Sequence, residues 1–258
     1  MRLEAALLAL PGIRHGFFGR PGGVSEGVFA SLNVGLRSGD ERARVLENRS
    51  RAAAALGASL EHLCIARQVH GVTCLRVDTA WEPSAPPEAD ALVTTRPDIL
   101  LGVTSADCAP VLLADPEAGV VAAAHAGWRG ALAGVLEAVV EGMIAAGAAP
   151  GRICAVVGPC IGRRSYEVGP DLRARFLEED PQSEPFFLEA AGSGRPRFDL
   201  EGYCVYRLGR AGVGRVQAVG RDTCAEAELF FSFRRTTLSG GGPFGLQLSA
   251  IRLDPERA

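Results

Sequence analysis

His125 stands at the junction of a predicted strand and a predicted helix. An apolar run beginning at Val120 leads into it, and Gly127 then turns the chain into an amphipathic segment that predicts a helix over 129–147. Backbone N–H groups at such a helix start are unpaired and favour an anion or an electron-rich ligand. The carboxyl end of a buried strand is a common place for chemistry in α/β proteins, although a hydrogen-bonded core histidine fits the same pattern.

A thiol and a second imidazole occupy comparable positions. Cys108 lies in a short polar break between two apolar, strand-like runs within 99–114, and His70 closes a short strand predicted over 65–72. Two imidazoles and one thiolate form a ligand set that suits zinc or copper and leaves a fourth position for water or substrate. The chain has no CxxC or HxxxH spacing here, so the fold would have to assemble this set.

The composition predicts one enzyme domain spanning residues 1–258. Hydrophobic residues make up 47% of the chain, enough for a large core. A net charge of −3 and a pI near 5.9 give no electrostatic reason to expect nucleic acid or a membrane surface as a partner. No apolar stretch approaches the roughly 20 residues of a membrane span. Met1 to Leu10 lacks a basic export signal and the seven cysteines are scattered, so we expect a cytoplasmic protein.

Short connections between predicted strands indicate the fold class. The apolar runs at 100–104, 111–114 and 120–124 follow one another too closely for parallel pairing, which needs a crossover of a dozen residues or more. These strands must pair antiparallel or pass from one sheet to another. We therefore expect an α/β (α+β) sandwich of mixed β-sheets packed together, with helices on the outside. One such helix is predicted to be capped by Asp40 and to run through Leu56.

Five longer motifs fall in the order and spacing of one known family. They are residues 15–33, 67–71, 104–113, 125–130 and 158–169. On these motifs the chain resembles the bacterial laccase-domain proteins, also called multicopper polyphenol oxidase-like or peptidoglycan editing factor proteins. Members with purine nucleoside phosphorylase and adenosine deaminase activity belong to the same family. The resemblance covers nearly the whole chain and implies two packed sheets between helices.

The resemblance implies metal-assisted chemistry on a purine nucleoside. His70 and His125 would bind the metal as neutral imidazoles and Cys108 as a thiolate, with Zn²⁺ expected and Cu²⁺ possible. Water at the fourth position would attack purine C6 and deaminate adenosine to inosine. Phosphorolysis would convert adenosine, inosine or methylthioadenosine to the free base and ribose 1-phosphate. Asp107 is a further catalytic candidate, which would orient a ligand, shuttle protons or hydrogen-bond the backbone.

Polar residues in the same motifs are candidates for contact with the nucleoside or with phosphate. They are Arg20, Asn33, Arg67, Gln68 and Arg129. The family's arginine–glycine turn, here at Arg20, lines the nucleoside and phosphate side of the pocket. Planar guanidinium groups match phosphate oxygens, which favours all three arginines, although Arg129 also suits a structural ion pair. Asn33 would hydrogen-bond either a turn backbone or the substrate.

One further position matches the family pattern, and one segment near the C-terminus departs from it. Asp90 matches an acid that family members carry just before a strand, and we interpret it as a turn cap. Near the C-terminus the family usually has a Gly-Arg pair, whereas residues 240–243 of this chain read Gly-Gly-Gly-Pro. The missing arginine puts its contact with phosphate or substrate in doubt.

Three other classes of protein use the same residues. A copper oxidase fits two histidines and one cysteine, but a full multicopper oxidase needs many more than the four histidines present. A cysteine hydrolase or amidase acting on peptidoglycan precursors would use Cys108 as nucleophile and His125 or His70 as base. Bound metal discriminates, because a ligating thiolate is not free to attack. A non-catalytic interaction module is the third class. We expect purine nucleosides and phosphate as partners and favour a monomer.

Overall fold

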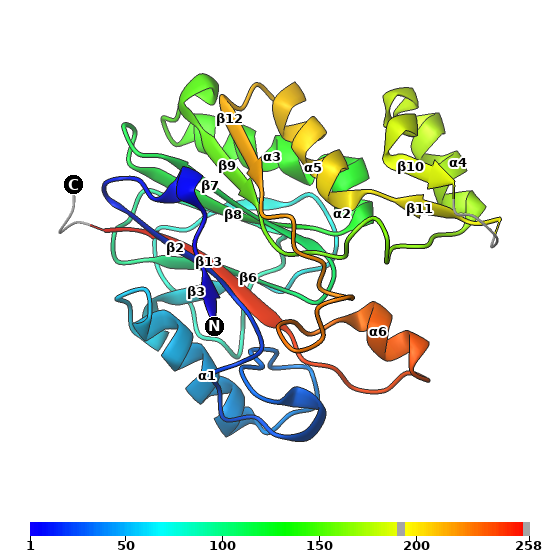
Figure 1. Cartoon of the computed structure of the whole chain (residues 1–258). Coiled ribbons are helices and arrows are strands. Elements are labelled where there is room, and N and C mark those ends of the chain that lie inside the picture. Colours follow the sequence, from blue (N-terminus) through cyan, green and yellow to red (C-terminus); the bar gives the residue numbers. More distant parts are fainter. Residues whose placement is uncertain (190–193, 255–258) are drawn as a thin grey trace.

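Two mixed β-sheets lie face to face in the computed structural model, which describes residues 1–189 and 194–254 (Figure 1). In spatial order the first sheet contains β1 (Arg2–Leu3), β2 (Ile13–Phe18), β13 (Gln247–Leu253), β6 (Leu100–Ser105) and β3 (Leu63–Ile65). The second contains β12 (Arg215–Ala218), β9 (Cys154–Val157), β7 (Ala109–Asp115), β8 (Val120–Ala126), β5 (Ala91–Thr94) and β4 (Cys74–Arg76). Strands β6 and β13 of the first sheet pack on β8 of the second.

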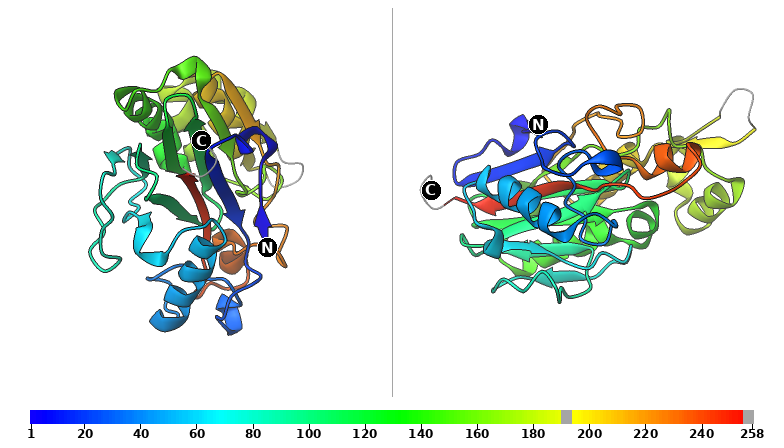
Figure 2. Two further views of the ribbon diagram at one scale, coloured as in Figure 1. Left: turned by 90° about the vertical axis from the view of Figure 1, so that its left-hand side faces the viewer. Right: turned by 90° about the horizontal axis from the view of Figure 1, so that it is seen from below.

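Helices cover the outer faces of both sheets (Figure 2). The helices are α1 (Arg42–Ala54), α2 (Trp128–Ala133), α3 (Val135–Ala145), α4 (Pro170–Glu179), α5 (Leu200–Arg210) and α6 (Phe233–Leu238). Helix α3 packs on β5 and β8, and α5 packs on β9 and β12, whereas α1 covers the first sheet. Helix α4 and the small sheet of β10 (Phe187–Glu189) and β11 (Pro196–Phe198) project at one end. The expected mixed α/β sandwich is confirmed.

The core is divided into three layers by the alternation of side chains along the strands. In β7, Val111 and Leu113 face the helices on the outer side, while Leu112 and Ala114 lie between the two sheets. Successive side chains of a strand point to opposite faces, so a strand covered on both sides becomes a continuous apolar run. This double burial explains why the sequence shows uninterrupted apolar stretches at the centre of the chain.

Two predicted elements differ from the structure. The helix predicted over 129–147 is divided into α2 and α3 at Gly134, whose φ of +106° is a left-handed conformation that glycine adopts without strain. The strand predicted over 65–72 ends at Ile65, and the chain continues as a loop that carries His70. Both differences arise where the backbone leaves regular geometry, which an apolar periodicity does not show.

Asp40 does not cap α1 as predicted. The helix begins at Arg42, and its N-cap residue, Glu41, forms no side-chain capping bond. The Asp40 carboxylate instead accepts hydrogen bonds from Ser25 Oγ (2.6 Å) and Asn33 Nδ2 (2.9 Å). It therefore joins two loops ahead of the helix.

No helix in the described part of the chain combines the length and apolar character that crossing a membrane requires.

Candidate metal centre

Cys108 lies where the chain passes from the first sheet to the second. Strand β6 ends at Ser105 and β7 begins at Ala109, so residues 106–108 make the crossing in a single tight turn. Within this turn Asp107 has a φ of +94°, which is unusual for a residue with a side chain. Because such a conformation needs support from the surrounding structure, the contacts of Asp107 determine where the Cys108 thiol lies.

The Asp107 carboxylate is held by the C-terminal part of the chain. It accepts hydrogen bonds from Thr223 Oγ1 (2.7 Å), Ser232 Oγ (3.0 Å) and the Arg234 backbone N–H (2.6 Å). Burial raises the pKa of this carboxyl despite these bonds. Both oxygens are thus engaged in fixing the turn that presents Cys108.

His125 is buried at the end of β8 with its ring orientation fixed by Asp90. Its Nδ1 lies 2.9 Å from Asp90 Oδ1, and its backbone N–H donates to the Asp90 carbonyl (2.7 Å). Burial alone would raise the pKa of Asp90, but hydrogen bonds from His125 and the nearby backbone outweigh burial and lower it. An ionised carboxylate can only accept, so the Nδ1 proton points at Asp90 and Nε2 is the ring nitrogen left for a metal.

The same carboxylate positions the second histidine. The backbone N–H groups of Val69, His70 and Gly71 donate to Asp90 at 3.1, 3.0 and 2.7 Å, and His70 adopts a φ of +60° within this loop. Asp90 is therefore more than the turn cap that the sequence suggests, because it holds both histidines. Its partners lie 19 to 35 residues away along the chain, so no local pattern reveals this role.

The ligating atoms of His70, Cys108 and His125 converge. All three lie within 4.8 Å of one another, and Cys108 Sγ is 3.7 Å from His70 Nε2. Zinc bonds of about 2.3 Å to sulfur and about 2.0 Å to nitrogen, at a tetrahedral angle, require an S–N separation of about 3.5 Å. The Cys108–His70 distance therefore matches zinc ligation, and all three donor atoms lie close enough together to share one ion. Their chemistry suits copper equally.

The electrostatics of the cluster favour a metal-binding thiolate. Burial opposes ionisation of Cys108, but the charges and hydrogen bonds of His125 and His70 outweigh it and lower the pKa of the thiol. Burial likewise opposes protonation of His125, while Cys108 and Asp90 raise its pKa. Gly127 leaves room for the cluster, because a Cβ there would lie 2.8 Å from His70 Cδ2 and 3.0 Å from Cys108 Sγ.

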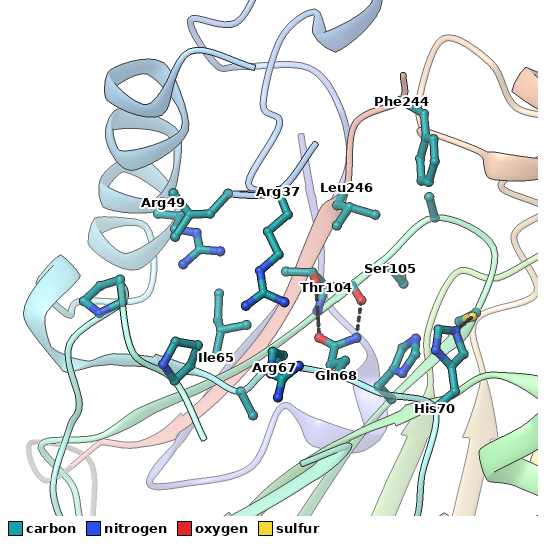
Figure 3. Close-up of a pocket in the computed structure, with 18 of the residues that line it drawn as sticks. Arg37, Arg49, Ile65, Arg67, Gln68, His70, Thr104, Ser105, Phe244 and Leu246 are labelled. Carbon is teal, nitrogen blue, oxygen red and sulfur yellow. Dashed lines mark hydrogen bonds between the residues drawn. The ribbon is translucent and has the colours of Figure 1, made fainter. Parts of the chain in front are cut away.

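A cavity of about 550 Å³ opens beside the three donors (Figure 3). Its volume is in the range of small-molecule sites. Arg67 and Gln68 both line it, but each has a partner already. Arg67 forms an ion pair with Glu88. Gln68 donates to the Thr104 carbonyl (2.7 Å) and accepts from the Thr104 N–H (2.8 Å), so its amide joins the His70 loop to β6.

Arg20 and Arg129 lie elsewhere. Arg20 donates from Nε to the Ala30 carbonyl (2.8 Å) and from Nη1 to the Ala227 carbonyl (2.9 Å), which joins two loops. Arg129 is exposed at the start of α2, with its guanidinium 5.1 Å from the centre of the Trp128 ring. The phosphate contact that the sequence suggests for these two arginines has no counterpart in the cavity lining.

Asn33 is fully buried and acts within the loops. Its Nδ2 donates to Ser38 and Asp40, and its Oδ1 accepts from the N–H groups of Gly35 and Leu246 at 3.0 and 2.9 Å. Of the two alternatives that the sequence leaves open for Asn33, these contacts correspond to hydrogen bonding of turn backbone.

Other lining residues were not singled out in the sequence. Ser105 lies three positions before Cys108 and is 2% exposed. Its Oγ has no hydrogen-bond partner within the described residues. Arg42 and Arg49 both line the cavity from α1. Their spacing of seven residues, two helical turns, places them on one face of that helix, a signal that the sequence does contain.

These features define a mixed α/β sandwich with a candidate three-donor metal centre at the passage between its sheets. Residues 14–254 match the family model described as multi-copper polyphenol oxidoreductase laccase, and the chain belongs to this family. It is 44% identical over 235 residues to a Deinococcus radiodurans protein named purine nucleoside phosphorylase, covering 90% of this chain and 87% of the relative. A Pseudomonas aeruginosa protein of the same name is 38% identical, covering 86% of this chain and 87% of the relative.

Solved structures of related proteins share the whole fold. A Neisseria meningitidis protein of the DUF152 family superposes with a TM-score of 0.87 at 34% identity, covering 98% of this chain and 99% of that one. YlmD from Geobacillus stearothermophilus superposes with a TM-score of 0.84 at 32% identity, covering 96% and 94%. The family resemblance inferred from the motifs is thereby confirmed.

Proposed function

We propose that this protein is a metal-dependent purine nucleoside phosphorylase that also deaminates adenosine. The observation that carries the proposal is the convergence of His70, Cys108 and His125 at the wall of a cavity large enough for a nucleoside. Relatives that cover most of the chain and bear the name purine nucleoside phosphorylase support it. We propose the cytoplasm as its compartment, in keeping with seven free thiols.

The three donors would hold Zn²⁺, or alternatively Cu²⁺. When bound, the metal would supply a Lewis acid beside the substrate. His125 offers Nε2 because Asp90 occupies Nδ1, and Cys108 offers a thiolate because the two imidazoles favour its ionised form. Asp107 acts as a positioning residue in this proposal, since it lies in the turn that carries Cys108 and its two oxygens attach that turn to the C-terminal part of the chain.

The nucleoside would lie between the metal centre and the aromatic side of the cavity. Phe233 and Phe244 line that side with their ring centres 5.2 Å apart, and aromatic faces suit a purine base. The Ser105 hydroxyl is the buried polar group left for the substrate, because a buried hydroxyl without a partner is costly. Arg67 lies on the cavity wall as a further candidate contact.

Two reactions share this site in the proposal. In phosphorolysis a phosphate oxygen forms a bond to ribose C1′ while the C1′–N9 bond breaks, and its electron pair leaves with the purine. The proton lost from phosphate returns to the purine, giving free base and ribose 1-phosphate, or 5-methylthioribose 1-phosphate when the substrate is methylthioadenosine. In deamination, water adds at C6 of adenosine and ammonia leaves, giving inosine. Adenosine, inosine and methylthioadenosine are the substrates that we propose.

Metal content and nucleoside turnover, measured together, test the proposal. Wild type, Cys108→Ala and a control, Cys74→Ala, would be incubated with adenosine with and without phosphate, and products separated by chromatography. Cys74 is a half-buried thiol in β4, outside the cavity lining. We expect adenine only with phosphate and inosine without it. Cys108→Ala should lose both products together with the metal, whereas Cys74→Ala should keep all three.

The same samples distinguish the cysteine hydrolase. Metal-free wild type that converts no nucleoside, but is modified at Cys108 by an acyl electrophile, would refute the phosphorylase and favour a nucleophilic thiol.

A further inference from the structure

Arginines dominate one wall of the cavity. Arg37, Arg42, Arg49 and Arg67 all line it, and none of the described lining residues is acidic. Figure 3 shows Arg37 and Arg49 extending from the side of α1 toward Arg67 and Gln68. Cavities lined by one sign of charge concentrate ligands of the opposite sign. This wall is therefore built for an anion.

Arg49 is the strongest sign of such a site. Its side chain is almost fully buried, at 7% exposure, and its Nε donates to the Val34 carbonyl (2.8 Å). No carboxylate within residues 1–189 and 194–254 forms an ion pair with it. Burial, followed by the charge of Arg42, lowers the pKa of Arg49 to about 10, so the group remains charged at neutral pH. Burying a charge without a partner is costly, and an anion from solution would remove that cost.

Arg37 is the second arginine of this wall that lacks an ion pair. It is solvent-exposed and lines the same cavity, and the described residues provide no acidic partner for it. Arg67, by contrast, is already paired with Glu88. Arg37 and Arg49 therefore bring guanidinium groups without a carboxylate partner to one cavity, and their planar forks of N–H donors match the oxygens of a tetrahedral oxyanion.

We propose that Arg37 and Arg49 form a phosphate-binding subsite of this cavity. The inference rests on the proposed function in one respect, since inorganic phosphate would then be the second substrate. It assigns the phosphate contact to residues other than Arg20, which is hydrogen-bonded to two loop carbonyls, and Arg129, which is exposed at the start of α2. The same chemistry would accept the phosphate ester of a nucleotide, so the experiment separates these two sources.

Direct binding tests the subsite without relying on turnover. Metal-loaded wild type, Arg37→Gln and Arg49→Met would be titrated calorimetrically with inorganic phosphate, and separately with AMP and adenosine. The matched control is Arg51→Met, which removes the same charge from an exposed position on α1 where Arg51 pairs with Glu47. Charge-assisted hydrogen bonds of this kind predict a rise of about ten- to a hundredfold in the phosphate Kd of both cavity variants.

Each outcome decides a separate question. Phosphate binding that weakens in Arg37→Gln and Arg49→Met but not in Arg51→Met supports the subsite, and the KM for phosphate should then rise relative to that for nucleoside. If AMP binds more tightly than adenosine and the two cavity variants abolish the difference, the source is a nucleotide ester.

The proposal would be overturned if the affinity for phosphate, and likewise the affinity for AMP, were the same in wild type and in all three variants. Arg37 is exposed, so its variant remains decisive if the buried Arg49→Met fails to fold. Wild type that binds phosphate at Arg37 and Arg49 but turns over no nucleoside would leave the subsite standing and refute the phosphorylase.

Discussion

Replacing Asp90 by asparagine should weaken metal binding through the two histidines that it positions. Its Oδ1 faces the N–H of His70 and Nδ1 of His125, and its Oδ2 faces the N–H groups of Val69 and Gly71. An amide must point its NH₂ group at one of these two sets of donors. If it faces His125, the proton moves to the ligating nitrogen. If it takes the place of Oδ2, the N–H groups of Val69 and Gly71, on either side of His70, lose their acceptor.

The size of the effect follows from these contacts. Each N–H left without its acceptor costs ~1–3 kcal/mol. Changing the hydrogen-bond partner of a ligating histidine typically lowers metal affinity by about 10- to 100-fold. We therefore expect the zinc affinity of Asp90→Asn, measured by competition with a chromogenic chelator, to fall by about one to two orders of magnitude. The unfolding free energy of the metal-free protein, from urea denaturation, should fall as well.

Asp115→Asn is the matched control. Asp115 is equally buried and accepts hydrogen bonds from the Ala118 and Ala149 N–H groups and from Arg152, but it lies outside the cavity lining. It should lower stability and leave zinc affinity unchanged. Wild-type zinc affinity in Asp90→Asn would refute the reasoning. An equal loss in Asp115→Asn would show that general destabilisation, and not histidine positioning, is responsible.

Three further predictions follow from single contacts. Gly127→Ala would place a Cβ against His70 and Cys108. We expect the variant to be folded by circular dichroism but to retain at least about tenfold less zinc after dialysis than wild type. Full zinc occupancy would contradict this prediction. Ser105→Ala should raise the KM for adenosine by about 5- to 30-fold while zinc content stays unchanged, and an unaltered KM would remove Ser105 from the substrate site. Burial opposes ionisation of Asp115, but its hydrogen bonds outweigh burial and lower its pKa. The ionised carboxylate therefore stabilises the folded protein above the unfolded pKa near 3.9, and this stabilisation is lost as pH falls through the folded pKa. The difference in unfolding free energy between wild type and the asparagine variant should therefore shrink below about pH 4, and a constant difference down to pH 2 would oppose the assignment.

The fold class was accessible from the sequence because it depends on short-range patterns. The apolar runs of β6, β7 and β8 are continuous since those strands are covered on both faces, and their short connections exclude parallel pairing. The motifs around His70, Cys108 and His125 indicated the donor set through the family resemblance. These features survive as sequence signals because each is local to a strand and the turn after it.

Only the tertiary structure decided which side chains serve the cavity. Asp90 holds His70 and His125 through contacts between distant segments, and a pattern read along the chain shows an acid before a strand and nothing more. Arg20 belongs to a family motif, yet its guanidinium joins two loops. Arg49 looks like an ordinary helical arginine in the sequence, yet it is buried beside the cavity. The direction of a side chain depends on what the folded chain places around it. Residue type and spacing therefore predict the available chemistry, and packing determines which residues can perform it.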